Sequence, residues 1–123
     1  MQNGKEKFKT ELKRRIYNWV LRLVEFLDKL PRDTITQRIV DQLFRSGASV
    51  GANYIEAQAS SSKKDFTNFL HYSLKSANES KFWLAILRDT KRCDNNEISQ
   101  ILDELIQISN ILGASILTAK GRK

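Results

Sequence analysis

Residues 8–31 read FKTELKRRIYNWVLRLVEFLDKLP and carry the clearest folding signal in the chain. Apolar residues recur there at every third or fourth position, which is the spacing of one face of an α-helix. They are Phe8, Leu12, Ile16, Trp19, Leu23, Leu27 and Leu30. Pro31 follows at once, and the residue before a proline is disfavoured in the helical conformation. We therefore predict a first helix over about residues 8–30.

Three further segments show the same periodicity, and short polar breaks separate them. The predicted helices cover about residues 35–59, 63–92 and 97–119. Thr34 and Ser62 are the predicted N-caps of the second and third helices. In the second helix the predicted core face is Ile39, Val40, Leu43, Phe44, Val50 and Ile55. Breaks of a few residues favour antiparallel neighbours. The sequence thus predicts an all-α fold, with one domain over residues 1–123 built as an antiparallel up-down-up-down four-helix bundle.

The composition is that of an ordinary globular chain. Of 123 residues, 41% are hydrophobic and 28% are charged, which is enough for one core. Five glycines and one proline are too few for the frequent turns of a β-sandwich or barrel. Cys93 is the only cysteine, so no intrachain disulfide can form, and we expect a reducing, cytoplasmic setting. The polar, basic N-terminus and the lack of a long apolar run predict neither a signal peptide nor a membrane span.

Two of the predicted helices are apolar on more than one side. The residues outside the main stripes are Tyr17, Leu21 and Val24 in the first helix and Tyr72, Trp83 and Ile86 in the third. A small monomer would have to expose several of these side chains. We therefore expect a second buried surface between copies of the chain, that is, a homo-oligomer. The alternative is that the core stripe of each helix is wider than drawn.

The formal charge of +7 comes from 21 basic and 14 acidic residues. An up-down bundle brings together the start of the first helix, the turn between the second and third, and the end of the fourth. Eleven basic and four acidic residues lie at that end, so it holds the entire excess. A one-sided basic cluster is typical of nucleic-acid binders, although basic termini can also serve solubility alone. The predicted phosphate contacts are Lys7, Lys9, Lys13, Arg14, Arg15, Lys63, Lys64 and Arg122.

The sequence contains no pattern that points to catalysis or to a metal. His71 and Cys93 are the only residues of their types, and a structural zinc site needs four ligands of the nitrogen or sulfur type. Phosphate-binding loops, dinucleotide fingerprints and nucleophile elbows are also missing. We therefore expect no catalytic residue, no metal, no cofactor and no enzymatic activity. Polar residues between the second and third helices favour a buried network that holds helix register over a carboxylate pair for acid–base chemistry.

Residues 46–57 read SGASVGANYIEA, and residues 61–66 read SSKKDF, followed by Ser76 and Glu79. Their order and spacing resemble the bacterial four helix bundle protein family. This family includes proteins encoded in intervening sequences of large-subunit ribosomal RNA genes and the accessory variability determinant of diversity-generating retroelements. Its pattern runs S-(V/I)-x-x-N-(I/Y)-x-E-(G/A), then S-K-x-(D/E)-F, then S-x-x-E. This chain departs from the pattern at Ala57, where glycine is commoner.

The resemblance implies a four-helix protomer that assembles as a ring-like homopentamer without enzymatic activity. Retroelement members bind nucleic acid and a reverse transcriptase, so the resemblance implies RNA or DNA and a reverse transcriptase as partners. Members of the intervening-sequence type have no established biochemical role. Together with the small centre of the second helix, the motif indicates close helix packing at Gly47, Gly51 and Ala52. The polar network implied by the motif is Asn53, Glu56, Ser76 and Glu79.

Two hypotheses for the function follow from the sequence. The first is a non-enzymatic, oligomeric nucleic-acid-binding accessory protein whose basic residues contact phosphates and do not read bases. The second is an oligomeric scaffold or partner-binding protein of the intervening-sequence type with no nucleic-acid role. In the second hypothesis the charged ends only keep the protein soluble.

Overall fold

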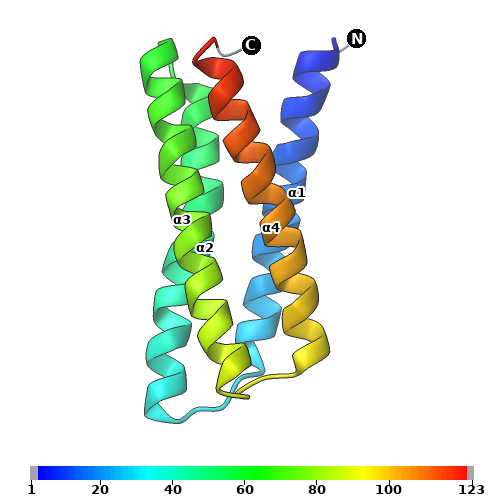
Figure 1. Cartoon of the computed structure of the whole chain (residues 1–123), viewed down its shortest axis with the longest axis vertical. Helices are drawn as coiled ribbons and strands as arrows, with labels where there is room; N and C mark the ends of the chain where they lie inside the picture. Colours follow the sequence, from blue (N-terminus) through cyan, green and yellow to red (C-terminus); the bar gives the residue numbers. More distant parts are fainter. Residues whose placement is uncertain (1–2, 122–123) are drawn as a thin grey trace.

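The chain forms four long helices, which the computed structural model describes over residues 3–121 (Figure 1). They are α1 (Gly4–Asp28), α2 (Thr34–Ala59), α3 (Lys63–Asp89) and α4 (Asn95–Ala119), and no strand occurs within these described residues. The prediction of an all-α chain with four helices is confirmed. The observed bounds lie within a few residues of the predicted ones; the largest differences are the earlier start of α1 and the earlier end of α3.

Helices that are neighbours in sequence are neighbours in space. α1 packs against α2, α2 against α3 and α3 against α4, and α4 closes the arrangement against α1. Successive helices run in opposite directions (Figure 1). The start of α1, the α2–α3 turn and the end of α4 therefore share one end of the bundle, which we call the terminal end. The α1–α2 and α3–α4 loops lie at the opposite end, which we call the loop end.

Each helix begins at a residue whose side chain accepts a hydrogen bond from the backbone N–H three positions further on. These N-caps are Asn3, Asp33, Ser62 and Asp94. Such caps satisfy N–H groups that have no partner inside the helix. The prediction of Ser62 is confirmed, whereas that of Thr34 is wrong by one position. The Asp33 carboxylate takes the cap because it reaches both the backbone N–H of Thr36 and the Thr36 hydroxyl.

The core runs through the middle of all four helices, with Trp19 and Phe26 as its largest fully buried side chains. In α2 the predicted core face is partly wrong, since Phe44 is 49% exposed and Ile55 is 48% exposed. The buried stripe of α2 instead passes through Leu43, Ser46, Gly47, Val50, Tyr54 and Ala57. Small residues occupy the middle of this stripe, so a pattern of large apolar side chains does not reveal it.

Serine and alanine side chains form the contact between α2 and α3. The hydroxyl oxygens of Ser46 and Ser80 lie 2.8 Å apart, and both residues are fully buried. Ser73, also fully buried, donates its hydroxyl hydrogen to the Val50 carbonyl at 2.7 Å. Each hydroxyl therefore has a partner, which offsets the cost of burying it. Residues this small allow the two helix axes to approach closely.

At the loop end, one arginine ties the two loops together. Arg92 donates from Nη1 to Oδ2 of Asp33 at 2.9 Å and to Oγ1 of Thr36 at 2.7 Å. The Thr36 hydroxyl in turn donates to Oδ1 of Asp33 at 2.7 Å. Hydrogen bonds from the Thr36 side chain and backbone, and then the Arg92 charge, hold the pKa of Asp33 below its ordinary value. The carboxylate therefore stabilises the closed end of the bundle while it is ionised.

This arrangement predicts a pH dependence that Asp33→Asn removes. A lowered folded-state pKa contributes stability above the unfolded-state value of 3.8, and that stability is lost as the pH falls through the folded-state value. Asparagine keeps a capping oxygen but no charge. We expect the urea midpoint of Asp33→Asn to lie below that of the parent at neutral pH and to converge with it in acid. Asp103→Asn removes an exposed carboxylate that forms no ion pair within residues 3–121 and serves as the control. If the urea midpoints of Asp33→Asn and the parent stayed equally far apart at every pH, the stabilising role of the ionised Asp33 carboxylate would be contradicted.

By length and composition alone α4 could cross a membrane, with a mean hydropathy of 1.3 in its most apolar window. This differs from the expectation of no such segment, because no charged residue follows Glu104 before the helix ends. The core helix of a soluble bundle passes the same test. Leu105, Ile108, Leu112 and Ile116 are buried inside the bundle, which accounts for much of the apolar character of α4.

Candidate nucleic-acid interface

The terminal end gathers positive side chains from three helices: the first turns of α1, the start of α3 and the end of α4 (Figure 1). We call the following residues the basic end: Lys5, Lys7, Lys9, Lys13, Arg14, Lys63, Lys64 and Lys120. All are exposed except Lys9, which is partly buried with its Nζ 5.9 Å from the centre of the Phe66 ring. The predicted contact Arg122 lies outside the described residues.

Ion pairs in the described part of the chain leave the basic end uncompensated. Five pairs form within residues 3–121, and none includes a member of the basic end. They are Arg15–Glu104, Lys29–Glu97, Arg45–Glu79, Arg88–Asp89 and Arg92–Asp33. Glu6 and Asp65 lie in the first turns of α1 and α3, where the helix dipole favours a negative charge. Within residues 3–121, charged side chains thus form ion pairs along the bundle and at the loop end. The side chains of the basic end form none.

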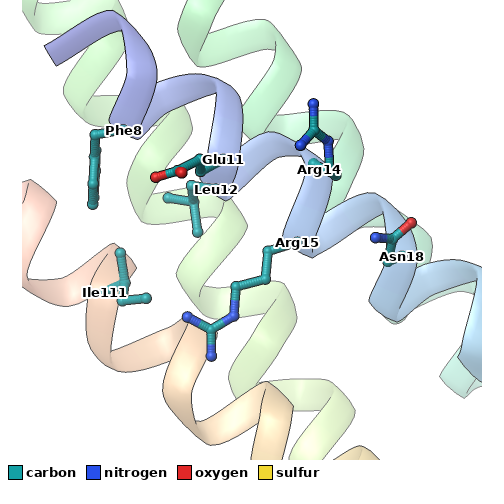
Figure 2. Close-up of a pocket in the computed structure, with 7 residues that line it drawn as sticks. All are labelled: Phe8, Glu11, Leu12, Arg14, Arg15, Asn18 and Ile111. Atoms are coloured by element: carbon teal, nitrogen blue, oxygen red, sulfur yellow. The ribbon is translucent and has the colours of Figure 1, made fainter. Parts of the chain in front are cut away.

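Two adjacent arginines in α1 have different environments (Figure 2). Arg15 points toward α4, where its Nε donates to Oε2 of Glu104 at 2.6 Å and its Nη2 donates to Oε1 of Glu104 at 3.0 Å. Nη2 also donates to Gln107 at 2.6 Å. Hydrogen bonding to Glu104 raises the pKa of Arg15. Arg14 points away from α4 and is exposed. The structure therefore places Arg14 in the basic end and Arg15 in the α1–α4 contact.

A shallow hollow of about 390 Å³ opens between α1 and α4 beside these arginines (Figure 2). Phe8, Leu12 and Ile111 line its apolar part. Phe8 belongs to the predicted core stripe of the first helix, yet it is 48% exposed. The ribbons of α1 and α4 lie further apart at the terminal end than in the middle of the bundle (Figure 1). An aromatic ring thus lies next to the basic end.

A second groove, of about 460 Å³, runs between α1 and α2 and is mostly apolar. Tyr17 and Ile55 line it, and Lys13 and Arg14 stand at its edge. We call the exposed residues along this side of α1 and α2 the apolar face: Tyr17, Leu21, Phe44, Ala52 and Ile55. Tyr17, at 62% exposed, and Leu21 agree with the expectation of apolar surface outside the core stripe. On α3 Trp83 and Ile86 instead pack against the core, so the stripe is wider there, whereas Tyr72 is half exposed as expected.

The two glycines of α2 face α1. A Cβ atom at Gly47 would overlap the Leu23 side chain and lie 3.4 Å from Cζ3 of Trp19. A Cβ atom at Gly51 would lie 3.4 Å from Cγ2 of Ile16. The predicted close packing therefore holds for Gly47, whereas a Cβ atom at Gly51 would make an ordinary van der Waals contact. The prediction does not hold for Ala52, which is exposed within the protomer.

Tyr54 lines the groove between α1 and α2. The side chain is buried, and its hydroxyl donates to the Lys9 carbonyl at 3.4 Å. Burial raises the pKa of the Tyr54 phenol to about 12. The neutral phenol therefore links α2 to the segment of α1 that carries the basic end.

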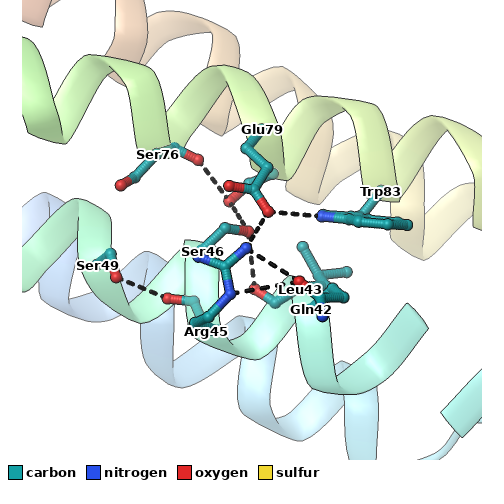
Figure 3. A network of polar contacts seen from close by, with 9 residues as sticks. Gln42, Leu43, Arg45, Ser46, Ser49, Ser76, Glu79 and Trp83 are labelled. Atoms are coloured by element: carbon teal, nitrogen blue, oxygen red, sulfur yellow. Dashed lines mark hydrogen bonds and ion pairs between the residues drawn. The ribbon is translucent and has the colours of Figure 1, made fainter. Parts of the chain in front are cut away.

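The polar network between α2 and α3 centres on Glu79 (Figure 3). Its Oε2 accepts hydrogen bonds from Arg45 and, at 3.0 Å, from Nε1 of Trp83. Arg45 also donates to Oε1 of Gln42 at 3.0 Å. The network lies at the surface edge of the helix contact, where Arg45 stays partly exposed. It pairs the Glu79 carboxylate, whereas Asp65 near the start of α3 forms no ion pair within residues 3–121.

The network prediction is correct for Glu79 and wrong for most other members. Ser76 takes part only through its carbonyl, which accepts from the Ser80 hydroxyl at 2.9 Å. Asn53 donates to Ser49 O in its own helix, and Glu56 is exposed without a hydrogen bond inside residues 3–121. Ser46 and Ser80, whose hydroxyls meet between the helices, went unpredicted. Ser46 and Ser80 lie one helical turn from the buried Val50 and Ala77, and that spacing was the available signal.

Residues suited to catalysis do not converge in the described structure. Within residues 3–121 no three His, Cys, Asp or Glu side chains lie close enough to hold a metal ion. Cys93 is partly buried, and burial, followed by Asp94 and Glu97, raises the pKa of its thiol. A thiol of raised pKa is a poor nucleophile at neutral pH.

Comparison with known proteins places this geometry in a family. The model of the family described as "23S rRNA-intervening sequence protein" matches residues 9–114. A solved structure with 30% sequence identity aligns at a TM-score of 0.79, covering 88% of this chain and 96% of the other. It is described as a protein with unknown function from the S23 ribosomal protein family of Bacteroides thetaiotaomicron VPI-5482. No curated protein matches the chain.

Proposed function

The chain belongs to the 23S rRNA-intervening sequence protein family, and from this premise we propose that it is a non-enzymatic nucleic-acid-binding protein that holds phosphates with its basic end. The observation that carries the proposal is the uncompensated charge of the terminal end. Every ion pair of the described residues lies elsewhere. A strand of nucleic acid that neutralises these lysines releases its own counterions, which favours binding entropically.

We further propose that copies of the chain associate through the apolar face. Large side chains that are about half exposed on two adjacent helices cost free energy in water and suit a protein contact. In a ring-like assembly every copy would turn its basic end toward one rim. Several basic ends on one rim raise the affinity for a polyanion through multivalency. The count of five subunits rests on the family resemblance alone.

The test is binding of a structured RNA and of a duplex DNA across a salt series, with protein freed of copurified nucleic acid. Each phosphate contact contributes about 0.9 to the slope of log affinity against log salt. We expect Lys13→Ala with Arg14→Ala, and Lys63→Ala with Lys64→Ala, each to lower that slope by roughly 2. Both variants should weaken binding to all sequences alike, because phosphates carry no sequence information.

The matched control is Arg32→Ala with Arg38→Ala, which removes two exposed cations at the loop end. We expect this pair to leave the slope and the affinity nearly unchanged. An equal loss in the control would show that binding follows net charge only. Binding that disappears near physiological salt would refute the proposal and leave the alternative of a scaffold. In that alternative the apolar face receives a partner protein.

A further inference from the structure

On the outer face of α3, polar and basic residues lie between the large exposed side chains. This distinguishes it from the apolar face. Tyr72 is 48% exposed and Phe82 is 59% exposed. Asn68, Lys75 and Phe82 follow each other at seven-residue steps, which places them on one side of the helix. We call the exposed residues of this side the aromatic track: Lys64, Asn68, Tyr72, Lys75 and Phe82. The track begins at the basic end with Lys64 and runs toward the loop end.

Both aromatic rings of the track are held by a neighbouring ring. Tyr72 meets Phe69 edge to face, with ring centres 5.8 Å apart, and Phe82 meets Trp83 in the same manner at 5.1 Å. Trp83 is itself fixed by its hydrogen bond to Glu79. A side chain that is already oriented loses little conformational entropy when a ligand binds it. The rings are therefore preorganised while remaining exposed.

The charge along the track is positive. Lys64 and Lys75 form no ion pair within residues 3–121. Two carboxylates lie on the same side of α3: Asp65 in the first turn, beside Lys64, and Glu79, which is paired with Arg45. Lysine is depleted from the centres of protein–protein interfaces. Exposed aromatic rings combined with a cationic groove or path are instead typical of surfaces that bind single-stranded nucleic acid.

We propose that the aromatic track binds single-stranded nucleic acid, with unpaired bases stacked on Tyr72 and Phe82 and phosphates at Lys64 and Lys75. This inference rests on the proposed function and specifies its ligand. Ten residues separate the two rings, or about 15 Å along the helix axis. That length corresponds to roughly four nucleotides at the 3.4 Å spacing of a stacked strand. A duplex cannot offer its bases to the rings, because they are already stacked and paired.

The experiment compares a 15-nucleotide oligothymidylate with a 15-base-pair duplex by fluorescence anisotropy near physiological salt. We expect Tyr72→Ala with Phe82→Ala to weaken single-strand binding by about tenfold or more. Duplex binding should change by less than about twofold, since it uses the basic end. Tyr72→Phe keeps the ring and should bind as the parent does, whereas Tyr72→Leu keeps only the apolar character and should lose affinity for the strand. Ile106→Ala with Leu117→Ala, which trims two exposed side chains of α4, is the control.

Three results would overturn the inference. Equal affinity of parent and Tyr72→Ala with Phe82→Ala for the strand would show that no base stacks there. Equal losses on strand and duplex would indicate a general effect. A smaller assembly mass for that variant by light scattering would make the aromatic track a contact between subunits. If Lys13→Ala with Arg14→Ala still weakens both probes in any of these cases, the proposed function stands without the track. If the parent protein binds neither probe, both proposals fail together.

Discussion

Gly47→Leu should lower the free energy of unfolding by about 3 kcal/mol, because α1 leaves no room for a side chain at this position. Even a Cβ atom would overlap the side chain of Leu23, and Trp19 lies immediately behind. Leu23 and Trp19 are both buried, so neither can turn aside into solvent. The gain of about 1 kcal/mol in helix propensity on replacing a glycine is too small to compensate. Urea unfolding followed by circular dichroism measures the change.

Gly113→Ala is the matched control for this prediction. Gly113 lies inside α4, and a Cβ atom there would have no neighbour within 4 Å. We expect this variant to gain about 1 kcal/mol from helix propensity. Leu23→Ala should make room for the new side chain at Gly47, so the double variant should be more stable than the two single losses predict by about 1 kcal/mol or more. Strict additivity, or an unchanged midpoint for Gly47→Leu, would contradict the close contact of α1 with α2.

Trp19→Ala should cost about 3–5 kcal/mol, the largest loss that we expect from a single side chain. Trp19 is 2% exposed and is one of the two largest fully buried side chains. Its ring packs beside Gly47 of α2, and its Nε1 donates to the Ile101 carbonyl of α4 at 3.0 Å. Within residues 3–121 the backbone of α1 lies next to those of α2 and α4. Removing the indole therefore weakens both contacts that hold α1 in the bundle.

Two further variants separate the volume of Trp19 from its hydrogen bond. Trp19→Phe keeps most of the buried ring and loses the N–H, so we expect a smaller loss of about 1–2 kcal/mol. Leu117→Ala trims a half-exposed side chain of α4 and should change stability by less than about 0.5 kcal/mol. Both are measured by the same urea titration. A loss at Leu117 comparable to that at Trp19 would show that the effect of Trp19→Ala does not come from its burial.

Periodicity predicted the helices well because it is a local property. The stripe of the first helix from Leu12 to Leu30 is buried as predicted, since residues three and four apart lie on one side of any helix. Phe8 belongs to the same stripe and is half exposed, because burial also requires a neighbour on another helix. In α2 the pattern of large side chains selected Ile55, whereas the structure buries Tyr54.

The candidate site was predictable only in part. That the basic residues meet at one end follows from the order of the helices and from short loops. The sequence does not show that Arg14 is open to solvent while Arg15 is paired with Glu104. The two adjacent residues are of the same type, and the partner of Arg15 lies on a helix distant in the sequence. The aromatic track was also invisible. Tyr72 and Phe82 belong to a helix with many aromatic residues, and only burial distinguishes those two from Phe66 and Phe69.

The amino-acid sequence by itself determined the number of helices, their approximate bounds, their antiparallel order and the end of the bundle at which the positive charge collects. These properties depend on spacing along the chain and on loop length, which are local. Tertiary structure alone decided which glycine touches α1, which arginine pairs with α4, which serines bridge α2 and α3, and which aromatic rings remain exposed. Those outcomes depend on how far each helix is rotated and shifted against its neighbours. Rotation and shift are set by the packing of all four helices together, so no single segment of sequence encodes them.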